Sequence, residues 1–325
     1  MKRIAIIGAG IAGLTLARLL APGSQVVVFE KSKGVGGRMA TRRSGECSFD
    51  HGAQFFTARS RAFRQFLQPS LAAGHIAEWS PRVLTLQENT KPWKRDWFEP
   101  HYVGVPTMTS LCKALANGID VQLATPVRAI ERHASGWHLR LGDDHCTDTF
   151  DWVISTAPAP QSRVLLPADF SGHAALAEVE LLPCFSLLLQ FEGICAWRFG
   201  AARIQHPVLQ WISCENSKPG RPPAFCVTLQ SSNEWAAQHY ADEDGVIAEA
   251  MLNALKAMLG EALPKVREQQ VKRWKLAKAA AQEEPLCLLD ARAQLAACGD
   301  WCREGTVEGA FHAARDLATA LQRLL

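Results

Sequence analysis

The pattern of apolar and polar positions in the first thirty residues predicts a strand, a helix and a second strand. Residues 2–7 and 25–29 are short runs of mostly apolar residues, typical of buried strands. Residues 14–20 have the character of a helix, and the turn before them reads G-x-G-x-x-G from Gly8 to Gly13. The second strand ends at an acidic residue, Glu30. A strand, a glycine-rich turn, a helix and an acid-ended strand together predict a dinucleotide-binding unit.

The residue types in this turn suit a pyrophosphate. Gly8 permits a tight turn, Gly10 leaves room for the pyrophosphate to approach the backbone, and Gly13 lets helix and strand pack closely. The helix N-terminus that follows adds free N–H groups and a partial positive charge that favour an anion, and we expect Ile11 and Ala12 of the turn to contact the cofactor. A purely structural glycine turn is the alternative, and the agreement of all four elements argues against it.

Glu30 narrows the choice of cofactor. A carboxylate at the end of the second strand accepts hydrogen bonds from ribose hydroxyls. A 2′-phosphate at the same place would bring two anions together. The site therefore suits FAD or NAD better than NADP.

The remaining pattern predicts further helices and strands. We expect helices over residues 60–73, 108–116, 242–259 and 308–324, strands over 121–127, 152–160, 185–191, 208–213, 224–231, 266–274 and 294–298, and a hairpin over 128–141. Four of these strands, between residues 185 and 274, are predicted to form one antiparallel sheet covered by the 242–259 helix. The apolar residues spaced for the buried face of that helix are Val246, Ile247, Ala250, Met251, Ala254, Leu255 and Met258.

Composition excludes several classes of protein. The 325 residues are 48% hydrophobic and 21% charged, which is ordinary for a globular chain with room for two domains. A net charge of +3 without a long basic run argues against nucleic acid as a partner. No run of eighteen apolar residues is present, so no membrane-spanning helix is expected.

The cysteine pattern predicts free thiols and no metal site. The ten cysteines are scattered singly and none forms C-x-x-C, which argues against a zinc ribbon or a dithiol redox pair. Such a chain is typical of the cytoplasm. The basic and apolar N-terminus resembles a secretion signal, but its removal would destroy the nucleotide-binding turn, so we expect it to be retained.

The segment after Glu30 points to the longer cofactor. Residues 31–43 carry a glycine cluster and several cations, among them Lys31 and Arg38, beside the expected pyrophosphate. An NAD-only dehydrogenase has no need of this segment, although a solvated basic loop remains an alternative. The glycine motif, Glu30 and then Gly36-Gly37-Arg38 resemble the flavin amine oxidase superfamily, and residues 50–59, DHGAQFFTAR, resemble its bacterial renalase-like branch.

The resemblance implies further contacts with a non-covalent FAD. It implies that the stretch with His51, Gly52 and Ala53 runs beside the flavin, with His51 in a structural role. It implies that Val127 contacts the adenine side through its backbone and that Ala157 ends a second cofactor-facing strand. Cys298-Gly299-Asp300-Trp301 and Glu308-Gly309-Ala310 are similar to the flavin-closing motif, in which Asp300 would hold the ribityl chain and the last helix would point its N-terminus at the flavin. A simple turn with a helix cap at Asp300 is the alternative.

The predicted fold class is α/β with an α+β second domain. The resemblance implies a Rossmann-like FAD-binding domain of the amine oxidase or p-hydroxybenzoate hydroxylase type with an inserted antiparallel-sheet substrate domain. We expect the FAD-binding domain to comprise residues 1–58, 105–162 and 288–325, and the substrate domain to comprise residues 59–104 and 163–287.

Two enzymatic activities compete. Amine oxidases of the superfamily carry an aromatic cage with a tyrosine shortly before E-G-A; here Thr306 stands in its place, beside Arg303 and Glu304. The renalase-like resemblance instead implies oxidation of aberrant dihydro isomers of NAD(P)H, the 2-dihydro and secondarily the 6-dihydro form. Hydride would pass to flavin N5, and dioxygen would reoxidise the flavin to give hydrogen peroxide. The nicotinamide leaves as an aromatic cation, so no catalytic base is assigned, and catalysis is mainly positioning.

Four residues are candidates for binding the dinucleotide substrate. The resemblance implies that Trp274 flanks the nicotinamide and stacks on it. We expect Gln54 to lie near the flavin edge and Asn216 to bond the carboxamide. Gln230 is in doubt because similar proteins carry a histidine near this position. A core tryptophan and a loop-capping asparagine are the alternatives. Lys218, with Arg42 and Arg43, either meets substrate phosphates or is solvated surface charge, the commoner outcome.

Other functions stay open. The chain is also compatible with a non-catalytic flavin- or nucleotide-binding protein. A carotenoid-type desaturase would need a more apolar substrate domain and a membrane-binding face, neither of which the sequence indicates. We expect no membrane partner and a monomer or weak homodimer.

Overall fold

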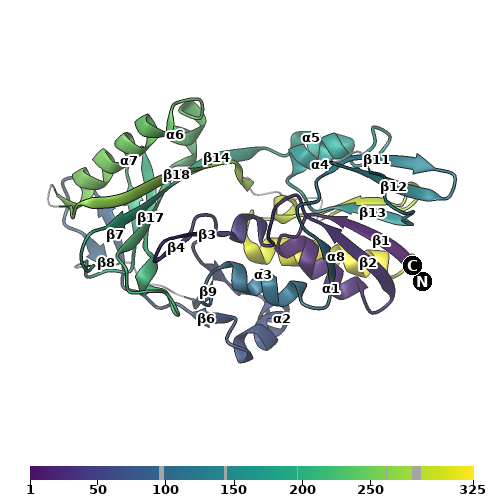
Figure 1. Cartoon of the computed structure of the whole chain (residues 1–325), viewed down its shortest axis with the longest axis horizontal. Coiled ribbons are helices and arrows are strands. Elements are labelled where there is room, and N and C mark those ends of the chain that lie inside the picture. Colours follow the sequence, from purple (N-terminus) through teal and green to yellow (C-terminus); the bar gives the residue numbers. More distant parts are fainter. Residues whose placement is uncertain (95–98, 143–144, 196, 261–262, 280–286) are drawn as a thin grey trace. The chain divides into compact units, whose positions relative to one another are not determined.

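The computed structural model describes the chain except for residues 95–98, 143–144, 196, 261–262 and 280–286. The chain divides into two compact units (Figure 1). Unit 1 comprises Met1–Arg38, Cys112–Leu181 and Ala279–Leu325, and unit 2 comprises Met39–Leu111 and Leu182–Lys278. Residues 39–58, which we expected in the FAD-binding domain, lie in unit 2. The functional domains themselves stay a prediction.

A mostly parallel sheet forms the centre of unit 1. Its strand order is β10-β2-β1-β13-β20-β19, and only the pair β19–β20 is antiparallel. The strands are β1 (Lys2–Ile7), β2 (Ser24–Phe29), β10 (Asp120–Gln122), β13 (Trp152–Ser155), β19 (Leu288–Asp290) and β20 (Leu295–Ala297). Strands β1 and β13 are buried over most of their length, which explains their continuous apolar runs.

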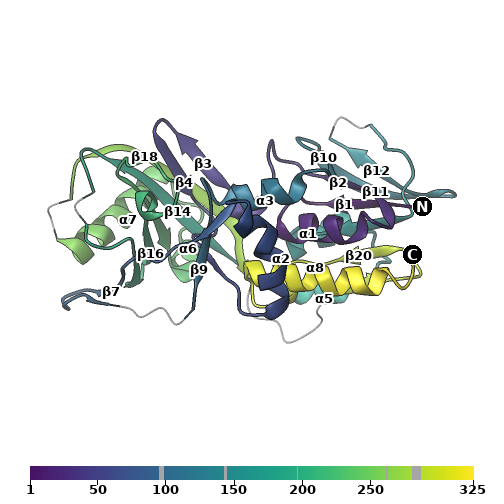
Figure 2. The ribbon, with the colours of Figure 1, turned by 90° about the horizontal axis from the view of Figure 1, so that it is seen from below.

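Helices and one hairpin complete unit 1. They are α1 (Ile11–Leu20), α4 (Ala159–Leu165), α5 (His173–Glu178), the 3-10 helix η3 (Asp300–Cys302), α8 (Val307–Leu321), and the hairpin of β11 (Val127–His133) and β12 (Gly136–Leu141). Helix α1 packs against α8 (Figure 2). The hydroxyl of Thr306 caps α8 by accepting a hydrogen bond from the Gly309 amide at 2.9 Å. Gly299 and Asp300 instead begin η3, with Gly299 as its N-cap residue.

Unit 2 is built on a seven-stranded sheet of order β18-β14-β17-β16-β15-β7-β8. Its strands are β7 (Val83–Gln87), β8 (Trp93–Lys94), β14 (Leu181–Phe191), β15 (Ala201–Gln205), β16 (Leu209–Cys214), β17 (Cys226–Ser231) and β18 (Val266–Ala279). The four strands expected between residues 185 and 274 all join this sheet. The pair β7–β15 is parallel, so the sheet is not purely antiparallel.

Smaller elements surround this sheet within unit 2. They are β3 (Thr41–Ser44) paired with β4 (Cys47–Asp50), the sheet of β5 (Phe56–Thr57), β6 (Ile76–Glu78) and β9 (His101–Gly104), the helices α2 (Arg61–Ala72), α6 (Asn233–Gln238) and α7 (Asp244–Leu259), and the 3-10 helix η2 (Glu215–Ser217). Four described elements span a boundary between the units along the chain: the 3-10 helix η1 (Gly37–Met39), α3 (Thr109–Ala116), and the strands β14 and β18, whose end residues Leu181 and Ala279 belong to unit 1. Helix η1 and β3 occupy a segment that we expected to be loop.

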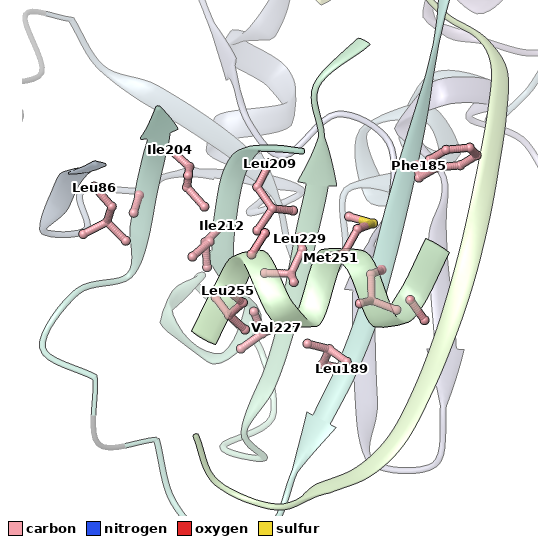
Figure 3. Packing of buried hydrophobic residues seen from close by; sticks show 14 of the residues in the cluster. Leu86, Phe185, Leu189, Ile204, Leu209, Ile212, Val227, Leu229, Met251 and Leu255 are labelled. Atoms are coloured by element: carbon pink, nitrogen blue, oxygen red, sulfur yellow. The ribbon is translucent and has the colours of Figure 1, made fainter. Parts of the chain in front are cut away.

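The core of unit 2 lies between α7 and the sheet (Figure 3). Met251 and Leu255 of α7 face Leu189, Ile212 and other apolar residues of the strands. Val246 was expected on this face but is 55% exposed. It precedes the buried Ile247 by one residue, or about 100° of helix rotation, and so points away from the stripe that Ile247, Met251 and Leu255 form.

A disulfide contradicts the expectation that all cysteines are free. Cys47 of β4 and Cys226 of β17, 179 positions apart in sequence, are joined, and the other eight cysteines are free. Neither cysteine carries a local sequence signal, because only the packing of β4 against β17 brings them together. Among the described residues, no helix has both the length and the apolar character needed to cross a membrane.

Candidate functional site

The glycine-rich turn of unit 1 has the geometry that its three glycines predict. Gly8 has φ of +108°, a left-handed value that favours glycine, and its amide donates to the Phe29 carbonyl at 2.8 Å. A Cβ on Gly13 would come within 2.0 Å of the Gly8 carbonyl oxygen and 2.7 Å of Thr156 Oγ1. A Cβ on Gly10 would meet no described atom within 4 Å. Gly13 is therefore needed for packing, whereas the space beside Gly10 is open.

Glu30 is fixed beside this turn. Its side chain is buried, Oε2 accepts from the Ala9 amide at 2.8 Å, and Oε1 accepts from the Ser32 amide at 2.8 Å. Each carboxylate oxygen keeps a second lone pair. The carboxylate is thus held in place by the backbone and retains the capacity to accept from ribose hydroxyls.

The segment after Glu30 folds back over the glycine turn. The Gly36 amide donates to the Ala9 carbonyl at 2.8 Å. Gly37 has φ of +53°, and a Cβ there would lie 3.6 Å from Gly10 Cα. Lys31 is exposed. The resemblance placed these residues around a cofactor, and the structure brings Gly10 and Gly37 next to each other.

Two predicted cofactor residues far apart in the sequence form an ion pair in unit 1. The Arg38 guanidinium binds the Asp300 carboxylate with both terminal nitrogens, Nη1 to Oδ2 at 2.7 Å and Nη2 to Oδ1. The Asp300 side chain is 9% exposed. A bidentate pair of this kind fixes the orientation of both groups.

The other predicted cofactor residues of unit 1 lie at the ends of its strands and helices. Ala157 follows β13, and its carbonyl accepts from Trp301 Nε1 at 3.0 Å. Val127 begins β11 and is partly buried. Ile11 and Ala12 are buried in the first turn of α1, which no side chain caps among the described residues. The first turn of α8 contains Glu308, Gly309 and Ala310.

These features fit a dinucleotide cofactor. A pyrophosphate fits the open space beside Gly10 and the start of α1, where no described side chain caps the helix. A ribose fits the Glu30 carboxylate, which the backbone holds in place. Sequence analysis missed Thr156, whose Oγ1 bonds the carbonyls of Ile7 and Gly8 at 3.0 and 3.1 Å and so braces the turn. Its only sequence signal is its place at the end of a strand next to β1 in the sheet.

In unit 2, the backbone around His51 gathers three of the four predicted substrate residues. Trp274 Nε1 donates to the His51 carbonyl at 2.7 Å, and the two rings stack with centroids 5.1 Å apart. Gln230 Nε2 donates to the Gly52 carbonyl at 2.8 Å. Gln54 Nε2 donates to the same carbonyl at 3.3 Å and to that of Asp50. Ala53 is partly buried in this turn, which we call the His51 turn (Asp50–Gln54).

Asn216 lies apart from the other three candidates. It belongs to η2 and lines a cavity of about 290 Å³ within unit 2, together with Cys195, Trp197, Cys214 and Ser217. Its Oδ1 is buried without a hydrogen-bond partner among the described residues. The structure gives no contact between Asn216 and the His51 turn.

Asp50, the first residue of the His51 turn, belongs to a cluster of four buried charged side chains. Lys218 Nζ binds Asp50 Oδ2 at 3.1 Å and Glu215 Oε2 at 2.8 Å, and Arg221 also binds Asp50. All four side chains are at most 1% exposed. The expectation that Lys218 is solvated surface charge is therefore wrong, because the carboxylates of β4 and η2 pair with it inside unit 2. We call Asp50, Glu215, Lys218 and Arg221 the buried ionic cluster.

The two carboxylates of the cluster differ in pKa. Burial alone would raise the pKa of Asp50, but Lys218 and Arg221, with hydrogen bonds from Thr41 and the Met108 amide, hold it below its usual value. Burial raises the pKa of Glu215, and the charge of Asp50 raises it further, against the opposing effect of Lys218. Asp50 is thus the carboxylate that the two cations stabilise in its ionised form.

His51 should make stability depend on pH. Burial, chiefly, and the positive charge of Lys272 lower its pKa to about 4, from 6.5 in an exposed histidine, although Asp50 opposes this. As the pH falls from 6.5 towards 4, the unfolded chain takes up a proton that the folded chain does not. At pH 5 this difference costs about 2 kcal/mol of unfolding free energy. In urea unfolding of the apoprotein, His51→Asn should therefore lose less stability between pH 7 and pH 5 than the wild type; equal losses would contradict the burial of a neutral ring.

The architecture and the site together define a Rossmann-type nucleotide-binding protein. The NAD(P)-binding Rossmann-like domain model matches residues 6–69, and the flavin-containing amine oxidoreductase model matches residues 88–322. The second match covers most of the chain, so the chain belongs to the flavin-containing amine oxidoreductase family and is a flavin-dependent oxidoreductase. The predicted fold class and the wider superfamily are thus confirmed.

Curated relatives match only locally. The chain is 50% identical to a 4,4'-diapophytoene desaturase of Staphylococcus haemolyticus over 50 residues, which is 15% of this chain and 10% of the relative. It is 40% identical to an L-amino-acid oxidase of Crotalus adamanteus over 68 residues, 21% of this chain and 13% of the relative. These matches cover little more than a tenth of the relatives' length.

Solved structures match over the whole chain. A protein provisionally assigned as a protoporphyrinogen oxidase from Exiguobacterium sp. 255-15 superposes with a TM-score of 0.80 at 13% identity, covering 99% of both chains. A wild-type putrescine oxidase bound to putrescine gives 0.77 at 14% identity, with the same coverage. At such low identity, these likenesses establish the fold and leave the substrate open.

Proposed function

We propose that this flavin-dependent oxidoreductase oxidises aberrant dihydro isomers of NAD(P)H, the 2-dihydro form first and the 6-dihydro form second. When bound without a covalent link, FAD supplies the hydride acceptor and passes the electrons to dioxygen, so that the isomer is returned to NAD(P)⁺ and hydrogen peroxide is released. Glu30 and the turn from Gly8 to Gly13 hold the FAD. The Arg38–Asp300 pair fixes the segment after Glu30 against the start of η3. His51, Gly52 and Ala53 stay predicted neighbours of the flavin.

The main support for the proposal is that Thr306 acts as the N-cap of α8. The superfamily resemblance places the cage tyrosine of amine oxidases at this position. Here the side chain is a hydroxyl that caps α8 through the Gly309 amide at 2.9 Å. Arg303, also expected to disturb such a cage, is paired with Asp316. Thr306 therefore maintains the helix start and supplies no aromatic ring for an amine.

The His51 turn suits a planar substrate that needs positioning. Trp274 is held by its bond to the His51 carbonyl and by stacking on the His51 ring, so its orientation is fixed before any ligand arrives. The pKa of His51, lowered to about 4 by burial, keeps this ring neutral at physiological pH. A dihydronicotinamide becomes an aromatic cation when it loses a hydride, so the reaction needs no catalytic base. A neutral, ordered surface that positions the ring is therefore sufficient for catalysis. Gln54 and Gln230 stay candidate substrate residues whose amides presently brace the turn.

A flavin amine oxidase is the second candidate. The family and the likeness to a putrescine oxidase favour it. A non-catalytic flavoprotein is the third, and it differs from both in lacking any substrate that reduces the flavin.

Anaerobic mixing distinguishes these candidates. The FAD-loaded protein is mixed with 2-dihydro-NAD, 6-dihydro-NAD, ordinary NADH, putrescine and L-amino acids while the flavin absorbance is followed. We expect rapid bleaching by a dihydro isomer, with NADH and the amines inert. Bleaching only by an amine would establish the second candidate, and bleaching by none of them would favour the third.

Variants at one residue locate the substrate site in the same assay. Trp274→Leu removes the ring and should slow bleaching by the dihydro isomer at least about tenfold, since positioning is the main catalytic contribution. Trp274→Phe keeps a ring and should retain most of the rate. Trp93→Leu, at an exposed tryptophan of β8, is the matched control. Equal rates for all three variants would remove Trp274 from the site.

A further inference from the structure

Two free cysteines of unit 2 lie at one cavity. Cys214 ends β16 and is 1% exposed, and Cys195 follows β14 and is partly buried. Both line the cavity of about 290 Å³ that also holds Asn216. Cys195 packs against the core cluster that contains Cys214, and each of the two thiols shifts the pKa of the other. Neither cysteine takes part in the Cys47–Cys226 disulfide.

The two thiols have opposite acidities. The hydrogen bond from Cys214 chiefly lowers the pKa of Cys195 to about 7, with help from the Trp197 backbone and against the effect of burial. The same interaction, together with burial, raises the pKa of Cys214 well above its usual value. Glu215 adds to that rise and Lys218 opposes it, while Arg82 and Arg198 line the cavity. Near neutral pH Cys195 is therefore the thiol that ionises, whereas the buried Cys214 keeps its proton.

The proton of Cys214 has two acceptors. In the structure its Sγ donates to the Phe199 carbonyl oxygen at 3.5 Å, and an ionised Cys195 sulfur at the same cavity would be the competing acceptor. A thiolate is the stronger acceptor, since hydrogen bonds to ionised groups are stronger than neutral ones. Ionisation of Cys195 therefore draws the S–H of Cys214 towards it and keeps the two sulfurs together.

We propose that Cys195 and Cys214 form a peroxide-reactive thiol pair, in which Cys195 attacks hydrogen peroxide and Cys214 resolves the product. The Cys195 thiolate takes one oxygen, the O–O bond breaks, and the leaving hydroxide takes up a proton to become water. Cys214 sulfur then attacks the sulfenic sulfur while its proton passes to the departing hydroxyl, so that the S–O bond breaks, an S–S bond forms and a second water leaves. Two thiols lose two electrons and two protons, and one peroxide becomes two waters. Asn216 Oδ1 at the same cavity, which has no hydrogen-bond partner among the described residues, can accept from the peroxide O–H.

The proposed oxidase reaction would supply the peroxide, and only this source of the oxidant rests on the proposed function. The test uses added hydrogen peroxide at pH 7 and peptide mass spectrometry. We expect a cross-linked peptide pair joining Cys195 to Cys214 and a loss of two hydrogens. Cys214→Ser should stop the cross-link and leave a sulfenic acid on Cys195 that dimedone traps. Cys146→Ser, at an exposed lone cysteine, is the control and should change nothing.

A second variant tests the pairing without peroxide. Cys214→Ala removes the hydrogen-bond donor, whereas Cys214→Ser keeps one. The rate of Cys195 alkylation by iodoacetamide at pH 7 should fall about fivefold in Cys214→Ala and much less in Cys214→Ser, because the thiolate fraction falls while its nucleophilicity rises. The proposal is overturned if Cys195 reacts with peroxide no faster than Cys146, if it cross-links elsewhere, or if the two variants alkylate alike. These outcomes do not depend on whether a dihydro isomer bleaches the flavin.

Discussion

Gly13→Ala should unfold the nucleotide-binding turn, whereas Gly10→Ala should leave the fold intact and weaken FAD binding. A Cβ at position 13 would lie 2.0 Å from the Gly8 carbonyl oxygen and 3.2 Å from the Gly8 carbonyl carbon. Backbone atoms cannot move aside as a flexible side chain can, so β1 and α1 must separate. We expect a loss of about 3 kcal/mol or more in the unfolding free energy of the apoprotein, measured in urea.

Gly10→Ala is the matched variant in the same turn. Gly10 has φ of −78°, which alanine adopts, and its Cβ would enter open space. The apoprotein should stay within about 1 kcal/mol of the wild type, the cost of a poorer helix cap. The same methyl group would occupy the place through which a pyrophosphate approaches the backbone, so FAD affinity should fall at least about tenfold. Unchanged FAD affinity in Gly10→Ala would place the pyrophosphate away from this turn.

The fold around this turn was predictable because its signals are local. A buried strand, three glycines at fixed spacing, a helix and a terminal acid are adjacent in sequence, and each element has its own chemistry. The start of the last helix, Val307–Leu321, was likewise predicted to within one residue. The resemblance indicated Arg38 and Asp300 as two separate cofactor-binding residues. Only the structure shows that they form an ion pair, 262 positions apart in the sequence.

The wrong predictions for Lys218 and for the two disulfide-bonded cysteines share one physical cause. Lys218 lies in a polar segment rich in proline and glycine, which ordinarily indicates an exposed loop. Its burial is decided by Asp50, 168 positions away, and by Glu215 on the same turn. Likewise, Cys47 and Cys226 meet because two strands pack. Interactions between distant segments leave no periodicity in the sequence, so pattern analysis assigns such residues to the surface.

The buried ionic cluster should be the most sensitive charged site of unit 2. Lys218→Met keeps the length of the side chain but leaves Glu215 without its nearest cation and Asp50 with Arg221 alone. Removing one partner of a buried ion pair leaves an uncompensated charge, so we expect a loss of about 3–5 kcal/mol in the unfolding free energy. Lys265→Met is the control: its ammonium pairs with Glu192 at 2.9 Å on the surface, with a 77% exposed side chain, and no measurable loss is expected.

A double variant separates charge balance from packing. Asp50→Asn alone should also destabilise, because Asp50 is the carboxylate whose pKa the cations lower, and this loss should shrink as the pH falls and Asp50 in the unfolded chain becomes protonated. In Lys218→Met/Asp50→Asn one charge of each sign is gone, so the double variant should be more stable than the sum of the single losses by about 1 kcal/mol or more. Strictly additive losses would mean that the two residues act independently. Lys218 Nζ also lies 3.4 Å from Gln54 Oε1, and Gln54 donates to the Asp50 carbonyl. The same single variants should therefore loosen the His51 turn. Trp274 donates to the His51 carbonyl of that turn, so its fluorescence should then report a more exposed ring.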